Sequence, residues 1–248
     1  MPNLSDLKVK IFADGADVSV IAEMAKNPLI KGFTTNPTLM RKANVRDYAE
    51  FAREVLSHVP EHPVSFEVFS DDFAEMALQA REIASWGANV FVKIPVTNTH
   101  SQFAGPLIQE LSNAGVQLNV TAVMTLKQVR AVTECLSHRT RSYVSVFAGR
   151  IADTGRDPIP LMQESVEILK TRPMAELIWA SPRELLNIFH ADACGCHVIT
   201  VTSDVLSKLK LVGKDLDAFS LETVEMFYSD AAKAGFNIEV VRPVPKSN

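Results

Sequence analysis

The stretch VFVKIPVT, residues 90–97, decides the predicted fold. It is an apolar run rich in β-branched residues, which is typical of a strand buried on both faces of a sheet. The proline at position 95 cannot donate to a sheet hydrogen-bond ladder, so we expect the strand to end near it. A single lysine, Lys93, interrupts the run just before that end. The predicted strand therefore delivers an amine to the end of a buried sheet.

Lys93 has more than one interpretation. Lysine is rarely buried, because a protein core cannot replace the hydration of its ammonium group. Burial disfavours the charged form of an amine, and a neutral amine attacks carbonyl carbons, so Lys93 could form a Schiff base. The same side chain could instead extend its charged end into water or bind an anion. The eight residues alone leave these alternatives open.

On both sides of this strand the same order of elements repeats. Short apolar segments predict strands at residues 9–13, 30–35, 64–68, 90–97, 118–123, 143–147, 177–180 and 197–201. Segments between and after them predict helices at residues 18–26, 47–57, 72–86, 102–114, 126–136, 158–170, 182–193 and 204–210. About eight strand–helix units predict an α/β fold, a single (β/α)8 TIM barrel. A doubly wound open sheet usually has a glycine-rich phosphate loop after its first strand, which this sequence lacks.

We expect the barrel to occupy residues 1–220 and an extension to occupy residues 221–248. The extension begins with an amphipathic helix at residues 221–234, which has Val224, Phe227 and Ala231 on one face. Since a helix beyond a closed barrel must cover something, we expect it to cover the barrel end or a neighbouring subunit. Residues 240–248 carry two prolines and are expected to be loosely ordered.

Composition restricts the class of protein. The chain has 248 residues, of which 47% are hydrophobic and 22% charged, as in soluble globular proteins. Its formal net charge of −4 gives no general attraction to nucleic acid or to anionic membranes. Three cysteines, no signal-peptide pattern and no apolar run of about 20 residues favour a cytoplasmic protein. We expect no cofactor and no metal, because the close spacing of His190, Cys194, Cys196 and His197 does not give a tetrahedral zinc site.

Polar residues gather at the carboxyl ends of the predicted strands, where barrels of this kind carry their chemistry. They are Asp14, Thr34, Asn36, Glu67, Lys93, Asn119, Thr121, Ser145, Arg150, Ser181 and Arg183. Each has a structural alternative: Asp14 could cap a turn, Asn36 could form an Asx-turn and Ser181 could cap a helix. Glu67 and Thr121 could be ordinary exposed strand residues. Their joint position at one rim of otherwise apolar strands favours a site.

Such a ring supports aldol chemistry through a Schiff base. The amine would attack a ketone and lose water to form an iminium, which draws electrons from the adjacent carbon–carbon bond. One carboxyl would move protons during dehydration and another would take a hydroxyl proton during cleavage, each contributing about 10²–10⁴ in rate. Amides and hydroxyls can hold a polyol, and guanidinium groups can bind a phosphate. This scheme needs no cofactor.

Four motifs in this ring resemble the transaldolase family. They are FTTNPT at residues 33–38, VKIP at 92–95, NVT at 119–121 and SVFAGRI at 145–151. The likeness runs in order from residue 9 to about residue 210. The length is similar to that of the compact branch, which also contains fructose-6-phosphate aldolases. The resemblance implies a Schiff-base transferase that acts on sugar phosphates.

The resemblance also implies roles for individual residues. Lys93 would form the Schiff base, Glu67 would assist dehydration through a water held by Thr121, and Asp14 would be the base for the C4 hydroxyl. The groups that hold the substrate would be Thr34, Asn36, Asn119, Ser145 and Phe147 around the dihydroxyacetone unit, and Arg150, Ser181 and Arg183 around the phosphate. Relatives of this kind form decamers built from two rings of five subunits, which implies that this protein is a homo-oligomer.

Two positions favour transfer over simple cleavage. The aldolases of this branch carry glutamine where this chain has Glu67, and tyrosine where it has Phe147. A carboxyl can exchange a proton with a bound water, and an apolar ring should leave the enamine intact until an acceptor arrives. We therefore predict a transaldolase that takes dihydroxyacetone from a ketose phosphate of the fructose 6-phosphate or sedoheptulose 7-phosphate type. The alternatives are an aldolase that releases free dihydroxyacetone, and a barrel that only binds sugar phosphates.

One departure from the family pattern concerns the anion site. The sequence after the seventh predicted strand is Ala180-Ser181-Pro182-Arg183, where a residue other than proline usually stands at position 182. Proline removes a backbone donor from the site. The nature of the anionic group, phosphate or a sulfonate as in sulfofructose, therefore stays open at this point.

Overall fold

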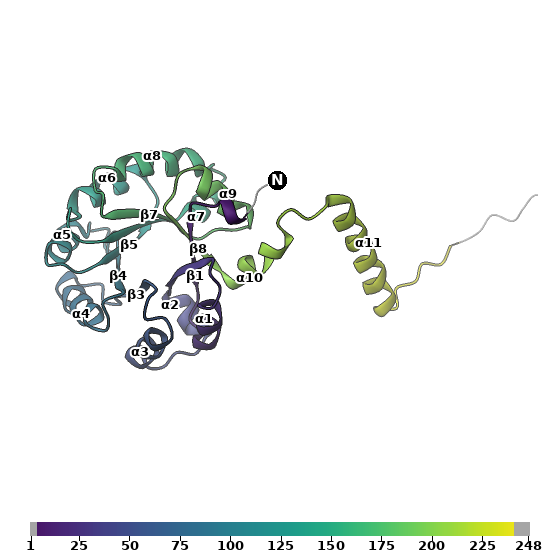
Figure 1. Cartoon of the computed structure of the whole chain (residues 1–248), viewed down its shortest axis with the longest axis horizontal. Helices are drawn as coiled ribbons and strands as arrows, with labels where there is room; N and C mark the ends of the chain where they lie inside the picture. The colour runs from purple at the N-terminus through teal and green to yellow at the C-terminus, as the bar shows by residue number, and fades with distance from the viewer. Residues whose placement is uncertain (1–3, 241–248) are drawn as a thin grey trace, which may run out of the picture. The chain divides into compact units, whose positions relative to one another are not determined.

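The computed structural model describes residues 4–240 and contains a closed barrel of eight parallel strands in sequence order (Figure 1). The strands are β1 (Lys10–Asp14), β2 (Ile30–Thr34), β3 (Val64–Glu67), β4 (Val90–Pro95), β5 (Leu118–Val123), β6 (Ser142–Val146), β7 (Ala175–Trp179) and β8 (Val198–Thr202). The predicted (β/α)8 fold is confirmed. The strand around Lys93 ends at Pro95, as expected from the missing backbone donor.

Helices lie outside the ring of strands (Figure 1). They are α1 (Val18–Met24), α2 (Pro37–Lys42), α3 (Tyr48–His58), α4 (Phe73–Ser85), α5 (Gly105–Asn113), α6 (Leu126–Cys135), α7 (Ala148–Ala152), α8 (Ile159–Leu169), α9 (Leu186–Ala193) and α10 (Ser203–Leu206), followed by the 3₁₀ turn η2 (Ser207–Leu211). Asp17 caps α1 by accepting from the Val20 backbone N–H at 3.1 Å, so the helix begins at residue 18, as expected.

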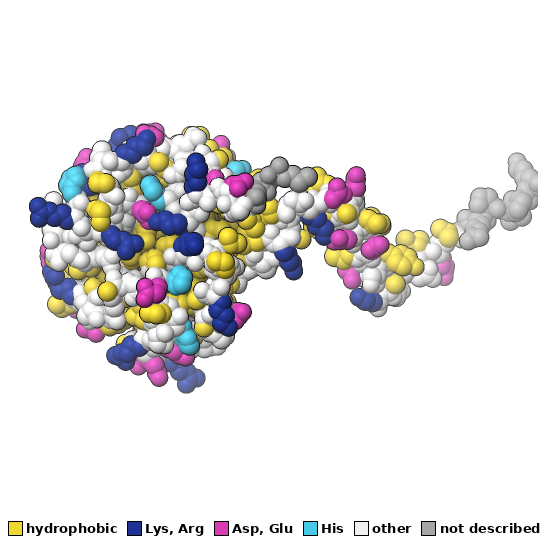
Figure 2. Space-filling view, in the orientation of Figure 1, with side chains coloured by type: hydrophobic (Ala, Val, Ile, Leu, Met, Phe, Trp, Pro, Cys, Tyr) yellow, Lys and Arg dark blue, Asp and Glu magenta, His cyan; other side chains and the backbone are white. Residues whose placement is uncertain are grey.

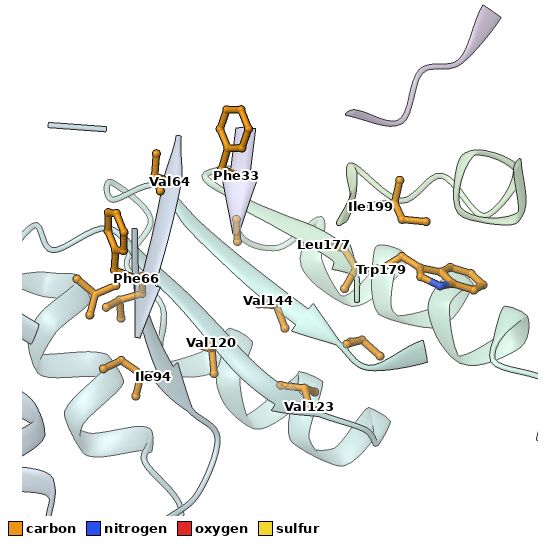
Figure 3. Packing of buried hydrophobic residues seen from close by; sticks show 14 of the residues in the cluster. Phe33, Val64, Phe66, Ile94, Val120, Val123, Val144, Leu177, Trp179 and Ile199 are labelled. Atoms are coloured by element: carbon orange, nitrogen blue, oxygen red, sulfur yellow. The ribbon is translucent and has the colours of Figure 1, made fainter. Parts of the chain in front are cut away.

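The main core lies between the strands and these helices. Figure 3 shows part of it, with side chains from β3 to β8 such as Phe66, Val120 and Trp179. These side chains are buried, and they pack against helix residues such as Met76 and Ile108. Strands buried on both faces need apolar residues at successive positions, which explains the continuous apolar runs in the sequence.

Inside the barrel, a layer of apolar side chains is followed, toward the carboxyl ends of the strands, by a layer of polar side chains. Phe12, Phe91 and Tyr143 form a buried cluster, and the rings of Phe12 and Tyr143 meet edge to face at 5.6 Å. Side chains alternate along a strand, so the next inward position lies two residues further toward the carboxyl end. On β1, β4 and β6 that position holds Asp14, Lys93 and Ser145 respectively. The strand period thus places these polar side chains together at one end.

Several helices differ from the sequence expectation. Asn36-Pro37, expected as a turn, opens α2: Asn36 is the N-cap and Pro37 the first residue, where its missing N–H costs nothing. The short helix α7 was not predicted, because five residues are too few for a periodic pattern. The helix expected from residue 182 begins only at Leu186, since the preceding residues form a turn.

The chain forms two compact units, and the boundary between them lies after Lys210. In the second unit the main element is α11 (Leu216–Lys233), which begins five residues before the expected helix at 221 and is capped by Asp215. No residue of α11 is buried. That the extension covers the barrel or a neighbouring subunit stays a prediction. Residues 241–248 of the tail that was predicted to be loosely ordered lie outside the described residues. Across residues 4–240, no helix has the length and apolar character that crossing a membrane demands.

Candidate active site

Lys93 lies at the carboxyl end of β4 and is only 7% exposed. Its Nζ donates to the backbone oxygen of Thr35 at 2.8 Å and lies 3.2 Å from Oε2 of Glu67. Glu67 and Lys93 are direct partners across β3 and β4, so their side chains leave neighbouring strands on the same side. The low exposure contradicts the alternative in which the lysine extends into water. The amine is instead held beside a carboxylate at the barrel end that carries active sites.

Tyr48 of α3 fixes the backbone of Glu67. The Glu67 N–H donates to the Tyr48 hydroxyl at 2.7 Å, and that hydroxyl donates to the Glu67 carbonyl at 3.0 Å. Burial raises the pKa of Tyr48, so the phenol stays protonated and able to donate. Tyr48 lies in the helix predicted at residues 47–57, but it was not among the predicted site residues. Its contact with a residue 19 positions away follows from tertiary packing, which local periodicity does not report.

Asp14, at the end of β1, accepts hydrogen bonds from two predicted site residues. Thr34 Oγ1 donates to Oδ1 at 2.8 Å, and Asn36 Nδ2 donates to Oδ2 at 3.2 Å. The hydroxyl of Thr34 is also hydrogen-bonded to that of Thr200 on β8. Burial raises the pKa of Asp14 above its ordinary value, and the charge of Lys93 and these two hydrogen bonds oppose that rise only in part. The carboxyl is therefore better suited to accept a proton than an exposed aspartate.

A second hydrogen-bonded chain crosses the barrel from β6 to β3. Ser145 Oγ donates to Asn119 Oδ1 at 2.7 Å, and Asn119 Nδ2 donates to Ser65 Oγ at 3.0 Å. All three residues are buried. Ser65 was not among the predicted residues, although it lies on the same inward-facing positions as Glu67. These bonds fix the orientation of the Asn119 amide at the level of Lys93, its register partner across β4 and β5.

Thr121 and Phe147 complete the ring of predicted residues. Thr121 is buried two positions beyond Asn119 on β5, hence on the same side of the strand. Phe147 packs against the inner aromatic cluster, and the guanidinium carbon of Arg150 lies 5.7 Å from the centroid of its ring. This is within the range of a cation–π contact. The Phe147 ring thus links the inner aromatic cluster to Arg150, the first arginine of the predicted anion site.

The loops after β6 and β7, which carry the predicted anion-binding residues, are in close contact. A Cβ atom on Gly149 would lie 1.5 Å from the backbone oxygen of Ser181 and 3.3 Å from Nε of Arg183. Only glycine fits at this position. Ser181 has φ of +61°, a strained conformation for serine, and it does not cap α9, whose N-cap is Leu185. The helix-cap alternative for Ser181 is therefore wrong.

Arg183 is held from two directions. Its backbone N–H donates to Asn187 Oδ1 at 2.8 Å. Its side chain forms a bidentate ion pair with Asp153, in which Nε donates to Oδ1 at 3.0 Å and Nη2 donates to Oδ2. Asp153 is the residue that closes α7, and nothing in its local sequence indicated this contact, which joins positions 30 apart.

Histidine and cysteine side chains form no metal site in the part of the chain that the structure describes. There, no three His, Cys, Asp or Glu side chains lie together as metal ligands would. His197 uses Nδ1 to accept from the Leu177 backbone N–H at 3.0 Å, and burial raises the pKa of Cys196. On the face seen in Figure 2, Lys and Arg side chains alternate with Asp and Glu over the 4–210 unit.

Comparisons with known proteins agree with this arrangement. The sequence model of the family described as "Transaldolase/Fructose-6-phosphate aldolase" matches residues 11–242. A "Probable transaldolase" of Dehalococcoides mccartyi is 36% identical over 202 residues, which cover 81% of this chain and 90% of that protein. A "Probable transaldolase" of Thermoanaerobacter sp. is 32% identical over 231 residues, which cover 93% of this chain and all of that protein.

A solved structure supports the fold alone. The crystal structure of a "putative lyase/mutase" from Burkholderia cenocepacia J2315 superposes with a TM-score of 0.59. The superposition covers 90% of this chain and 84% of the other, at 14% sequence identity. At this identity the likeness shows a shared barrel and carries no argument about the reaction.

Proposed function

The chain belongs to the transaldolase/fructose-6-phosphate aldolase family, and on this premise we propose that it is a transaldolase with a Schiff-base mechanism. It would move a dihydroxyacetone unit from a ketose phosphate, such as fructose 6-phosphate or sedoheptulose 7-phosphate, to an aldose phosphate. The observation that carries the proposal is the buried Lys93 amine, 3.2 Å from one carboxylate and within the electrostatic reach of a second, Asp14.

In the first half of the reaction, Lys93 passes a proton to Glu67, and the resulting amine attacks C2 of the ketose to form a carbinolamine. Glu67 gives a proton to the departing hydroxyl through a water beside Thr121, and water leaves as the iminium forms. Asp14 then removes the proton of the C4 hydroxyl, the C3–C4 bond breaks, and its electron pair moves into an enamine. An aldose shorter by three carbons departs, and the triose unit stays bound to Lys93.

In the second half, the enamine carbon attacks the aldehyde carbon of the acceptor. Asp14 returns its proton to the new alkoxide, and water adds to the iminium to release the longer ketose and the free amine. Asn36, Asn119 and Ser145, whose side chains are held by hydrogen bonds at the same rim, would hold the hydroxyls of the bound triose. Arg150, Ser181 and Arg183, on adjoining loops, would hold the phosphate.

A relative specialised for another anionic ketose is the second candidate. Pro182 lies between Ser181 and Arg183, and it has no backbone N–H for an anion. A sulfonate such as that of sulfofructose carries one charge and accepts fewer strong hydrogen bonds than a phosphate dianion. The rates of transfer from fructose 6-phosphate and from sulfofructose to the same acceptor, measured side by side, distinguish the two candidates.

Acceptor dependence tests the proposal against simple aldol cleavage. The purified protein is mixed with fructose 6-phosphate, with and without erythrose 4-phosphate, and the products are measured. Since Phe147 offers no hydroxyl near the intermediate, we expect sedoheptulose 7-phosphate with the acceptor and little dihydroxyacetone without it. Release of dihydroxyacetone at the same rate in both mixtures would identify an aldolase instead.

The variant Phe147→Tyr probes the same distinction in one residue. A phenol at this position places a proton donor beside the enamine, so release of free dihydroxyacetone should rise several-fold relative to transfer. The added hydroxyl lies at the barrel mouth, where Phe147 is only partly buried, so the fold should be kept. An unchanged ratio of release to transfer would show that position 147 does not control the fate of the enamine.

We further propose that the extension is a subunit interface and that the protein is a homo-oligomer. Large apolar residues on α11 are exposed, with 64% of Phe227 and 78% of Tyr228 accessible, and Figure 2 shows hydrophobic side chains along this helix. Exposed apolar surface of this kind favours association. Light scattering should give a mass that is a multiple of the 27.3 kDa of one chain, with pentamers or decamers expected. A mass of one chain would disprove the interface.

A further inference from the structure

We propose that Asp153 is a positioning residue for the anion site, which it serves by holding the Arg183 guanidinium in one orientation toward the substrate. This inference rests on the proposed function, in which Arg183 contacts the anionic group of the sugar. Asp153 itself would not touch the substrate. Its effect would appear only with donors that carry the anionic group.

The geometry of the ion pair decides which edge of Arg183 is free. Guanidinium has five N–H donors in a rigid plane. Asp153 accepts from Nε and from one N–H of Nη2, which is the edge nearest the arginine stem. The other edge of the planar group, formed by Nη1 and the second N–H of Nη2, can still donate twice to an oxyanion. A bidentate partner therefore orients Arg183 without consuming the donors that a phosphate needs.

The surroundings of Arg183 leave few other orientations. Asn187 fixes its backbone through the 2.8 Å bond to the N–H, and Pro182 restricts the backbone before it. Nε lies 3.3 Å from the position that a Cβ of Gly149 would occupy, so the guanidinium passes directly over the start of α7. Asp153 closes the same short helix that carries Arg150. The helix α7 thus contains one arginine of the proposed site, and the residue that closes it binds the other.

Two opposing effects follow from a carboxylate beside an anion site. It repels the incoming anion, and it also removes the entropic cost of ordering a long arginine side chain during binding. Asp153 and Arg183 are about half exposed, at 51% and 48%, so solvent and salt screen the repulsion. The two hydrogen bonds that order Arg183 act at contact distance, so they are screened less than the repulsion of a more distant anion. We therefore expect the net effect of Asp153 to favour binding of the phosphorylated donor.

The test compares Asp153→Asn with the wild-type chain on two donors, fructose 6-phosphate and fructose. Unphosphorylated erythrose serves as the acceptor throughout, so that both donors give sedoheptulose and only the donor differs in charge. We expect KM for fructose 6-phosphate to rise about three- to ten-fold, the range set by ordering one long side chain. kcat for that donor and kcat/KM for fructose should not change. A loss shared by both donors, or a lower KM for fructose 6-phosphate, would overturn the proposal.

A matched control is Glu164→Gln. Glu164 of α8 forms an ion pair with Arg130 of α6, with side chains 47% and 56% exposed respectively. The substitution Glu164→Gln removes one negative charge from a similar ion pair, so the kinetics of this variant should equal those of the wild-type chain. In an Arg183→Met background, Asp153→Asn should have no further effect on KM, because residues that act through one another are not additive. Independent effects of the two substitutions would contradict the proposed role.

Calorimetric titration with inorganic phosphate gives a second reading that needs no turnover. The Kd for phosphate should rise by the same factor in Asp153→Asn and stay unchanged in Glu164→Gln. If the wild-type chain turns over neither donor, but Kd for phosphate rises in Asp153→Asn and not in Glu164→Gln, the proposed function fails and the role of Asp153 stands. If both variants bind phosphate as the wild-type chain does, Asp153 does not position the anion site, whatever the reaction is.

Discussion

Replacing Lys93 by methionine is expected to reduce the conversion of fructose 6-phosphate to that of a mixture without enzyme. Methionine has nearly the same length as lysine and suits an apolar interior, but its thioether cannot add to a ketone. No other group near Glu67 would then form the Schiff base. The measurement is the rate of sedoheptulose 7-phosphate formation, with circular dichroism to confirm that the variant is folded.

Lys10→Met is the matched control for this variant. Lys10 lies at the amino end of the barrel, where its side chain is 39% exposed and Nζ donates to Glu176 Oε1 at 2.6 Å. Both variants remove one lysine from a barrel strand and leave one glutamate without its cationic partner. Lys10→Met should keep its turnover. An equal loss in both variants would attribute the effect to damage of the barrel, and turnover that persists in Lys93→Met would place the chemistry on another residue.

Asp14→Asn is expected to lower turnover by about 10²–10⁴, the usual contribution of a proton-transfer group. Because burial raises the pKa of Asp14, its ionised form costs stability at neutral pH. The neutral asparagine should therefore unfold at a higher temperature than the wild-type chain at pH 7. Below the ordinary pKa of aspartate, Asp14 is protonated and as neutral as the asparagine, so the difference in melting temperature should vanish.

The same raised pKa predicts the acid side of the pH profile. Cleavage requires ionised Asp14, so kcat/KM of the wild-type chain should fall as pH drops through a value above the ordinary 3.8 of aspartate. A pH–rate profile and a thermal melting series measure the two effects. Higher stability without loss of turnover would show that Asp14 is buried near the site but is not the base.

Asp17→Asn provides a control of opposite sign in the same loop. Hydrogen bonds from Ser19 and Val20 lower the pKa of Asp17, so its ionised form stabilises the fold above the ordinary pKa. The substitution should lower the melting temperature at pH 7 and leave turnover unchanged. If Asp14→Asn and Asp17→Asn changed stability in the same direction, burial would not be the dominant influence on Asp14.

The strand period explains why the sequence predicts so much of the site. Asp14, Lys93 and Ser145 each follow an aromatic residue of the inner cluster by two positions, and alternation alone places them on one layer. The order of strands in a parallel barrel then makes Glu67 and Lys93 neighbours. Sequence reasoning needed no distances for this, because the fold fixes which strand ends meet.

Residues whose role depends on a side-chain contact between distant segments were not predicted. Tyr48 reaches Glu67 from a helix surface, and Asp153 reaches Arg183 across two loops. Periodicity reports which face of an element is buried, but not which polar tip on that face finds a partner. The Asn36-Pro37 pair shows a different limit: an N-cap followed by proline begins a helix as readily as it forms a turn.

The central claim is that the amine of Lys93 forms a covalent bond with a ketose. Borohydride reduction of the wild-type chain with fructose 6-phosphate, followed by digestion and peptide mass mapping, tests it directly. The account predicts a reduced triose or hexose adduct on the peptide that contains Lys93, with Lys10 unmodified. An adduct on another lysine, or none after turnover has been demonstrated, would contradict it.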